Sequence, residues 1–277
     1  MRRLSSQEIK LIELDILREF ARICEKYNLS YLLAYGTALG AVRHQGFIPW
    51  DDDIDVFMPR ADYEKLYYLC TSSDVLSSPY QLVSYRDESS IYQFFKIVDR
   101  RTSAYETFVG KTHPIGLWID IFPLEPVGGV NKKVLSKVLR RQRRIGLLRS
   151  FAVADPNVGS SSVIVAVKKI ISPIARRFDL RKLAEKLDEN ARSAGEMGTE
   201  ESWYDIVGMC GPFDGSIMFP ASKVCFENGL FNGPAQPKAF LAQQYGNWES
   251  VPPENKRDVH FPEAYVINEE ITQHGAH

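Results

Sequence analysis

Cysteine is scarce in this sequence, and no two cysteines lie close together. The four of them, at positions 24, 70, 210 and 225, form no Cys-x-x-Cys pair. Such spacing argues against a disulfide framework and against a zinc site. It is typical of separate, buried thiols in a reducing compartment.

Long apolar segments are also missing. The basic start of the chain, MRRLSSQE, is not followed by the apolar stretch of a signal peptide. No apolar run approaches the roughly 18 residues that a membrane-spanning helix needs. We therefore expect a cytoplasmic protein. With 277 residues, 44% of them hydrophobic and 25% charged, the chain is long enough to bury a full core, as one large domain or one domain with a lobe.

The net charge of −1 conceals two regions of opposite sign. Between residues 126 and 178 there are twelve basic residues and one acidic residue, so this stretch carries about +11 and the remainder about −12. A solvated charged helix is the ordinary explanation. Apolar residues accompany the cations, however, which favours peripheral contact with an anionic membrane, here the inner face of the cytoplasmic membrane. No nucleic-acid reader motif is present, so we expect no nucleic-acid partner.

Four aspartates crowd into five positions near the end of the first fifth of the chain, where residues 50–56 read WDDDIDV. Like charges this close repel each other, and a bound cation removes that cost. Asp53 and Asp55 are two residues apart, so on a strand they point to the same side. Their oxygen atoms suit Mg²⁺, with Mn²⁺ as an alternative. The competing interpretation is a solvated acidic turn or a helix cap at 51–55.

The segment before the aspartates favours the metal interpretation. An apolar run at 31–35 is followed by Gly36 and Thr37 and then by a short helical pattern that ends at His44. A strand, a glycine turn and a helix N-terminus together offer backbone N–H groups to a phosphate. We expect Gly36, Thr37 and Arg43 to hold phosphate oxygens. His44 either contacts the same diphosphate or is structural.

A third carboxylate, Asp120, stands alone in the apolar strand pattern WIDIF at 118–122. Such a residue is costly unless it faces a cation or is hydrogen-bonded. Beside Asp53 and Asp55 it supplies a third metal ligand or a general base from an adjacent strand; the alternative is that it caps a neighbouring turn. Lys96, in the pattern FFKI, either reaches a phosphate or extends from an edge strand into solvent.

Periodicity predicts an α/β protein. A capping box at Ser5 and Glu8 begins a helix that ends near Tyr27. Further helices are expected at 37–44, 60–70, 131–152, 163–177, 179–195 and 238–245. Strands are expected at 30–35, 53–58, 81–85, 92–99, 102–106, 117–122 and 203–207. We interpret residues 1–277 as a single domain with a catalytic core at 1–125, a basic helical insert at 127–200 and a part at 201–277 that completes the core.

Three segments resemble the LicD family of phosphocholine transferases, which are distantly similar to fukutin and fukutin-related protein. Residues 36–55 read GTALGAVRHQGFIPWDDDID, residues 119–124 read IDIFPL, and residues 245–257 read YGNWESVPPENKR. Tyr35 stands where the family pattern Gly-Gly-Thr has its first glycine, which leaves Gly36 to take unusual backbone angles. The resemblance covers roughly 30–125 and 203–257.

This resemblance implies a nucleotidyltransferase-type mixed sheet with flanking helices, like the palm of DNA polymerase beta. It makes Asp53, Asp55 and Asp120 the metal-binding and catalytic residues. It also implies transfer of phosphocholine from CDP-choline to a hydroxyl of a lipid-linked cell-surface glycan precursor, of the teichoic acid, lipopolysaccharide or capsule type, with release of CMP. The alternatives are transfer of ribitol or glycerol phosphate from a CDP-alcohol, NMP transfer with release of pyrophosphate, and a non-catalytic cation- or nucleotide-binding module.

Overall fold

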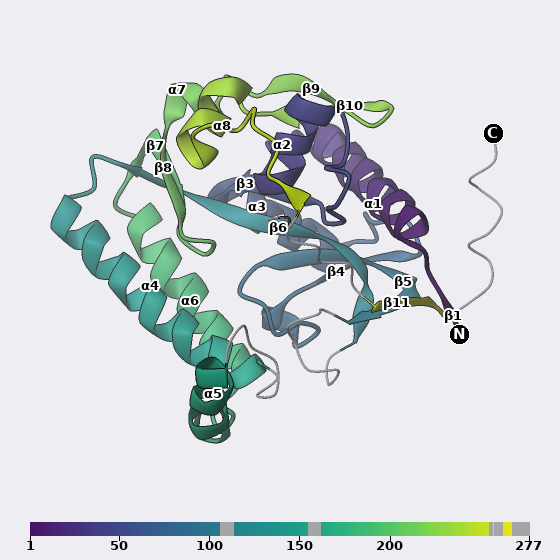
Figure 1. Ribbon diagram of the computed structural model, residues 1–277. Helices are drawn as coiled ribbons and strands as arrows, with labels where there is room; N and C mark the ends of the chain where they lie inside the picture. Colours follow the sequence, from purple (N-terminus) through teal and green to yellow (C-terminus); the bar gives the residue numbers. More distant parts are fainter. Residues whose placement is uncertain (106–113, 155–161, 255–256, 258–262, 268–277) are drawn as a thin grey trace.

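The computed structural model describes residues 1–105, 114–154, 162–254, 257 and 263–267 (Figure 1). Its helices are α1 Ser6–Tyr27, α2 Tyr35–His44, α3 Arg60–Ser72, the 3₁₀ helix η1 Tyr85–Asp87, α4 Lys132–Val153, α5 Ser162–Ala175, α6 Leu180–Gly195, α7 Gly215–Met218 and α8 Pro237–Tyr245. Its strands are β1 Arg2–Arg3, β2 Leu32–Leu33, β3 Asp55–Pro59, β4 Tyr80–Val83, β5 Phe95–Tyr105, β6 Ile115–Gly128, β7 Thr199–Asp205, β8 Cys210–Asp214, β9 Ser222–Phe226, β10 Gly229–Gly233 and β11 Glu263–Val266.

A curled, mixed sheet occupies the centre of the molecule. Its strands follow the order β1-β11-β5-β6-β3-β2, while β4 pairs with β5 and the β7–β8 pair continues from β6. β3 and β6 are parallel, whereas β5 and β6 are antiparallel. β6 is 14 residues long, so its first part joins β3 and β5 and its last part joins β7. The predicted α/β class is confirmed.

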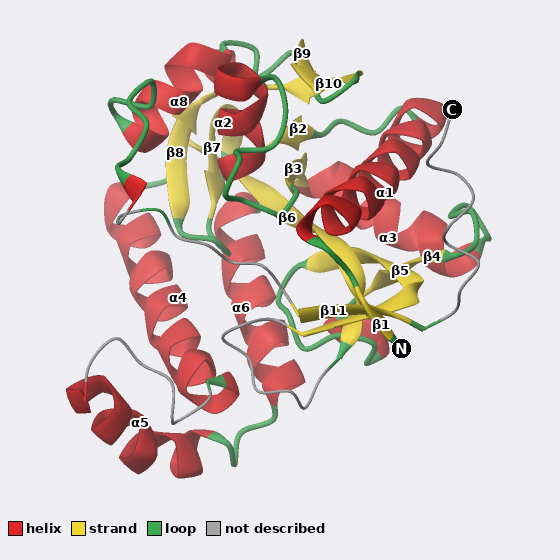
Figure 2. Ribbon diagram, turned by 45° about the vertical axis from the view of Figure 1, so that its right-hand side comes forward, coloured by secondary structure: helices red, strands yellow, loops and turns green. Residues whose placement is uncertain are grey.

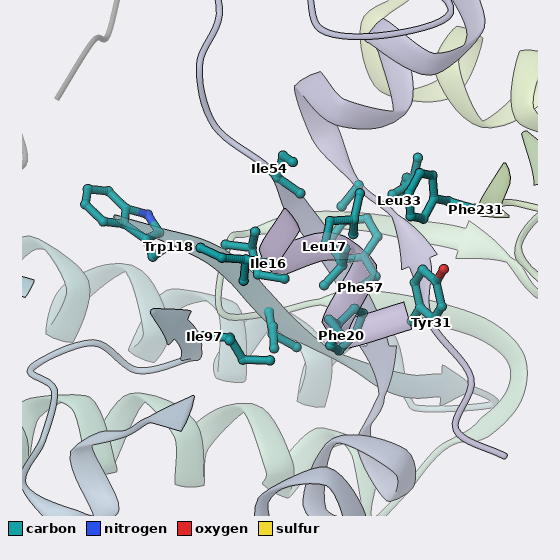
Figure 3. Packing of buried hydrophobic residues seen from close by; sticks show 14 of the residues in the cluster. Ile16, Leu17, Phe20, Tyr31, Leu33, Ile54, Phe57, Ile97, Trp118 and Phe231 are labelled. Carbon is teal, nitrogen blue, oxygen red and sulfur yellow. The ribbon is translucent and has the colours of Figure 1, made fainter. Parts of the chain in front are cut away.

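Helix α1 supplies much of the main core. The predicted capping box is present, because the Ser5 side chain accepts from the Glu8 backbone and the Glu8 side chain accepts from the Ser5 backbone. The helix packs on β5 and β6, and in Figure 2 it lies in front of the sheet with α3 behind it. Leu17 and Phe20 are fully buried beside Phe57 and Tyr31 (Figure 3). Burial of each such side chain stabilises the fold by about 1.5–3 kcal/mol.

The helices α4, α5 and α6 form the side of the molecule opposite α1 (Figure 1). α4 packs against both α5 and α6, and α6 contacts β6. A second apolar cluster lies between α4, α6 and the strands β6 and β7, and it includes Val138 of α4, Ala191 of α6 and Tyr204 of β7. Across the described residues, no helix has both the length and the apolar character needed to traverse a bilayer.

A buried ionic network fixes α6 to the sheet. It joins Arg60, Arg86 and Arg192 to Glu64, Glu125 and Asp188. Asp188 lies 2.9 Å from Arg60 and 3.0 Å from Arg86. Burial acts to raise the pKa of Asp188, but these two guanidinium groups outweigh it and hold that pKa at about 2. The carboxylate is therefore charged at every physiological pH.

Several predicted boundaries were wrong. The strand predicted at 30–35 is only Leu32–Leu33, because α2 already begins at Tyr35. The two strands predicted at 92–99 and 102–106 are one strand, β5, whose pairing with β6 shifts register between Asp99 and Ala104. No element was expected at 208–237, yet β8, α7, β9 and β10 form there. Pairing with β7 and with each other stabilises these short strands, and local sequence patterns do not reveal such pairing.

Candidate active site

The sheet brings the predicted carboxylates together. Asp55, the first residue of β3, is the register partner of Asp120 on β6, and the Asp120 backbone N–H donates to the Ile54 carbonyl at 2.9 Å. Asp53 lies two residues before Asp55, just outside the strand. The prediction that Asp120 comes from a strand adjacent to these residues is confirmed. Asp55 and Asp120 project from the same face because they are register partners.

Thr37 fixes the beginning of β3. Its hydroxyl oxygen accepts from the Asp55 backbone N–H at 2.8 Å, and the hydroxyl can donate to the Asp53 carbonyl at 3.5 Å. The side chain is 2% exposed. Thr37 therefore holds the backbone that carries Asp53 and Asp55. The sequence analysis predicted only a contact of Thr37 with phosphate and not this positioning role.

The glycine turn predicted at Gly36 is not observed. Gly36 lies in the first turn of α2, and the left-handed backbone angle belongs instead to Tyr35, at φ +42°. The Tyr35 hydroxyl donates to the buried carboxylate of Asp205, which secures this conformation. A Cβ atom at position 36 would lie 2.6 Å from Oδ2 of Asp51, so a larger residue there would displace that carboxylate. Gly36 thus allows the close approach of an acidic side chain and does not supply an unusual backbone angle.

The N-terminus of α2 faces the aspartates. Its N-cap residue, Ala34, makes no side-chain capping bond, so no side chain caps the first backbone N–H groups. These groups carry the positive end of the helix dipole. They are a suitable site for a phosphate, as predicted from the sequence pattern.

Carboxylates crowd this end of the sheet. Burial, followed by the nearby charges of Asp53 and Asp120, raises the pKa of Asp55 well above its usual range. Burial, with Asp53 and Asp51, raises the pKa of Asp52 to about 8. Both carboxyl oxygens of Asp52 are buried and make no hydrogen bond. The region therefore holds more carboxyl groups than it can keep ionised without an added cation.

Glu13 of α1 belongs to the same cluster, although sequence analysis did not identify it. It is 2% exposed, and its Oε2 makes no hydrogen bond. Burial, with the charges of Asp52 and Asp53, raises its pKa well above the usual range. One signal was available: Glu13 interrupts the apolar stripe of α1 between Ile9 and Ile16, a position that a solvated glutamate does not occupy.

Lys96 supplies the opposite charge. Its Nζ lies 2.7 Å from Oδ1 of Asp120, and its side chain is 1% exposed. The ammonium also lies over the rings of Tyr92 and Trp118, at 4.4 Å and 4.3 Å from their centroids. The alternative of a solvent-extended edge lysine is therefore wrong. Asp120 does not cap a turn either, because it lies inside β6.

The structure does not place Arg43 and His44 with the aspartates. They occupy the last turn of α2, about 10 Å along the helix from Gly36. Arg43 donates to the carbonyl of Trp248 at 3.0 Å and to Nε2 of His44 at 2.9 Å. Burial, followed by the neighbouring Arg43, lowers the pKa of His44, so the imidazole is neutral at pH 7. Their contact with a diphosphate stays a prediction.

Tyr245, at the end of α8, lies close to the cluster although it is far from the aspartates in the sequence. Burial, with the charges of Asp55 and Asp51 among its causes, raises its pKa. The site thus assembles α1, the start of α2, β3, β5, β6 and the end of α8. Only the long-range packing of the fold brings these segments together, although Tyr245 begins the third segment of family resemblance.

The donor atoms fit a hard divalent cation, which prefers carboxylate oxygens and few protein ligands. Crowded carboxylates and the orphaned oxygens of Asp52 are both relieved by such an ion. Among the residues that the structure describes, no three His, Cys, Asp or Glu side chains already stand as a metal cage. This is compatible with Mg²⁺, which commonly binds one or two carboxylates and takes its remaining oxygens from water and substrate phosphates.

Comparison with known proteins defines the class. Residues 28–145 match the family described as LicD/FKTN/FKRP, nucleotidyltransferase domain, so the chain carries a LicD family domain. The predicted resemblance is confirmed, and the matched range contains all eight site residues named from the sequence: Gly36, Thr37, Arg43, His44, Asp53, Asp55, Lys96 and Asp120.

Three individual relatives also align with the chain, and one of them aligns along nearly all of it. The lipopolysaccharide cholinephosphotransferase LicD of Haemophilus influenzae is 27% identical over 288 aligned residues, which cover 96% of this chain and 100% of the relative. An uncharacterised protein of Rickettsia prowazekii is 26% identical over 145 residues, which cover 43% of this chain and 52% of that protein. An uncharacterised protein of Rickettsia typhi is 42% identical over 48 residues, 17% of this chain and 16% of that protein.

Proposed function

We propose that this protein is a metal-dependent enzyme that transfers phosphocholine from CDP-choline to a hydroxyl of a cell-surface glycan precursor and releases CMP. The LicD family domain and the named relative, which aligns with 96% of the chain, support this proposal. They also confirm the prediction that the chain is an enzyme of the transferase class. Within the site, the pairing of Asp55 with Asp120 beside the N-terminus of α2 carries the proposal.

The proposed core is of the nucleotidyltransferase type. Three features of the sheet support it: a helix N-terminus directly after β2, the aspartates at the start of β3, and a third aspartate on the parallel neighbour β6. A phosphate donor bound there meets N–H groups on one side and carboxylates on the other. Anionic oxygens and carboxylates repel each other, so the pair requires a cation between them.

Asp53, Asp55 and Asp120 are the residues that would hold this cation, Mg²⁺ or Mn²⁺. When bound, the ion neutralises the diphosphate and the charge that develops on the leaving CMP. The chain itself contributes position: Thr37 fixes the backbone of Asp53 and Asp55, and the first N–H groups of α2 hold non-bridging oxygens.

The transfer forms one P–O bond and breaks another. The acceptor oxygen bonds to the phosphorus of phosphocholine, and the bond from that phosphorus to the CMP oxygen breaks. The proton of the acceptor hydroxyl passes to a carboxylate, for which Asp120 is our candidate. Lys96, 2.7 Å from Asp120, keeps that side chain oriented.

A donor screen tests the proposal. The full chain is incubated with CDP-choline, CDP-ribitol, CDP-glycerol or nucleoside triphosphates, with Mg²⁺ or with EDTA, and with soluble hexoses as acceptors; CMP and pyrophosphate are quantified by chromatography. We expect Mg²⁺-dependent CMP release that is fastest with CDP-choline. CMP release mainly from another CDP-alcohol, or pyrophosphate release from a triphosphate, contradicts the proposed donor.

A matched pair of variants tests the site. Asp53→Asn should lower turnover by about a thousandfold, because a metal ligand is worth several kcal/mol in the transition state. Asp74→Asn, a change of the same kind at an exposed residue, should leave turnover unchanged. Circular dichroism checks that both variants are folded. Full activity in folded Asp53→Asn protein would refute the metal-binding role.

A further inference from the structure

Helix α5 directs a row of apolar side chains outward. Val167, Ile170, Ile171 and Ile174 follow the spacing i, i+3, i+4 and i+7, which places them on one face of the helix. They are 39%, 72%, 36% and 59% exposed. In a helix that only completes a core, this spacing marks the buried face. Here the residues that are buried are small: Ser172 and Ala175.

Two more exposed apolar side chains lie on the same packed helices. Leu147 of α4 is 57% exposed, and Phe178, three residues after α5, is 49% exposed. The end of α5 is tied to the end of α4, because Arg176 donates to the Ala154 carbonyl at 3.1 Å. The apolar row is therefore held in place by the fold.

Basic residues predominate around this face, and the exposed acid Asp179, which follows Phe178, caps the start of α6. Neither α4 nor α5 contains an acidic residue. Lys169 and Arg177 are exposed beside the apolar row, and α4 contributes a line of exposed cations: Lys132, Lys133, Lys137, Arg140, Arg141, Arg143 and Arg144. An apolar row surrounded by cations is complementary to a surface that is negative outside and hydrocarbon beneath.

We propose that α5 docks the enzyme on an anionic lipid bilayer, with the helix lying along the interface and the apolar row inserted below the headgroups. Its 14 residues extend about 21 Å, less than the roughly 30 Å hydrocarbon layer, so the helix lies on the membrane and does not cross it. In both Figure 1 and Figure 2, α5 lies at one end of the α4–α6 pair and the β9–β10 hairpin lies beyond the other end. Docking through α5 therefore leaves the hairpin end of the molecule uncovered.

The apolar row distinguishes a bilayer from a nucleic acid. Nucleic acids bind cations and stack on aromatic rings, but they offer nothing to exposed isoleucines. A bilayer binds both features at once. The inference concerns where the enzyme works and does not depend on which group it transfers, so it goes beyond the proposed function.

Vesicle flotation tests the proposal without any substrate. The full chain is mixed with vesicles of phosphatidylcholine alone, or with 30 mol% phosphatidylglycerol. We expect flotation with the anionic vesicles at low salt and its loss at high salt. Ile170→Gln/Ile174→Gln should weaken binding by about tenfold or more. The matched control, Leu11→Gln/Leu230→Gln, changes two exposed apolar residues outside the insert and should bind like the parent chain.

Charge is tested in the same way. Lys169→Glu should weaken vesicle binding more than fivefold, since each cation near an anionic surface contributes about that factor and the reversal also adds repulsion. Lys238→Glu, on α8, should leave it unchanged. Absence of flotation at low salt, or equal binding by the Ile170→Gln/Ile174→Gln variant and its control, overturns the proposal. The proposal is also overturned if the Ile170→Gln/Ile174→Gln variant still binds duplex DNA as the parent chain does, or if it loses a self-association that the parent chain shows without lipid.

Discussion

Two clusters of charge lie at different points along β6, one around Glu125 and one around Asp120, and they are built differently. The network of Arg60, Arg86 and Arg192 with Glu64, Glu125 and Asp188 has three cations for three carboxylates. The site cluster has six carboxylates, and two lysines oppose them: Glu13, Asp51, Asp52, Asp53, Asp55 and Asp120 with Lys10 and Lys96. A balanced cluster is complete within the protein, whereas an unbalanced one anticipates a cation from outside.

Removal of Asp188 should give the largest effect on stability. Asp188→Ala leaves Arg60 and Arg86 facing each other in a buried position, and arginine does not lose its proton. We expect a loss of about 3–5 kcal/mol in the free energy of unfolding, measured with urea. Glu185→Ala, at an exposed position of the same helix, should change it by less than about 0.5 kcal/mol.

Replacement of Lys96 should cost less, and a metal should repair it. Lys96→Met leaves Asp120 without its ion pair, but a carboxylate can take up a proton, so we expect a loss of about 2–3 kcal/mol. Saturating Mg²⁺ should restore most of this stability in Lys96→Met and none of it in Asp188→Ala. Equal responses of the two variants to Mg²⁺ would remove the distinction between the clusters.

The two clusters should also respond to pH with opposite sign. The raised pKa of Asp52, about 8, means that the metal-free fold favours the protonated acid, so this contribution is full below pH 4 and is lost as pH rises toward 8. The lowered pKa of Asp188, about 2, gives a contribution that is present above pH 4 and is lost as pH falls toward 2.

The measurement is the urea midpoint of the metal-free protein between pH 4 and 8. Titration of Asp52 should make the free energy of unfolding fall by up to about 1.4 kcal/mol per pH unit. Asp52→Asn should abolish this dependence on pH, and Asp74→Asn should leave it unchanged. Saturating Mg²⁺ should flatten the slope of the parent chain. An unchanged slope in Asp52→Asn would show that Asp52 is not a buried, raised-pKa acid.

Sequence patterns predicted the parts of this structure that depend on neighbours in the chain. The capping box of α1 and the helices α4, α5 and α6 follow from spacing alone, whereas the shared face predicted for Asp53 and Asp55 assumed a strand from residue 53 and β3 begins only at Asp55. The pairing of Asp120 with the first aspartates was also predictable, since a lone acid in an apolar strand is costly without a partner.

Features that depend on distant contacts were not predictable. Glu13 joins the site only because α1 packs across β5 and β6. Lys96 is buried because β5 has neighbours on both sides, whereas its local pattern also suits an edge strand. Gly36 lies against the Asp51 carboxylate, a contact that no turn pattern encodes.

The ionic network has a mechanical consequence for the candidate site. Pro59 of β3 pairs with Leu124 of β6, and the next residues, Arg60 at the start of α3 and Glu125 inside β6, form an ion pair five residues along the chain from Asp55 and Asp120. Sliding one strand past the other by a single residue would break this pair and turn a carboxylate to the wrong face. The guanidinium of Arg60 therefore helps to keep Asp55 and Asp120 in register from about 15 Å away.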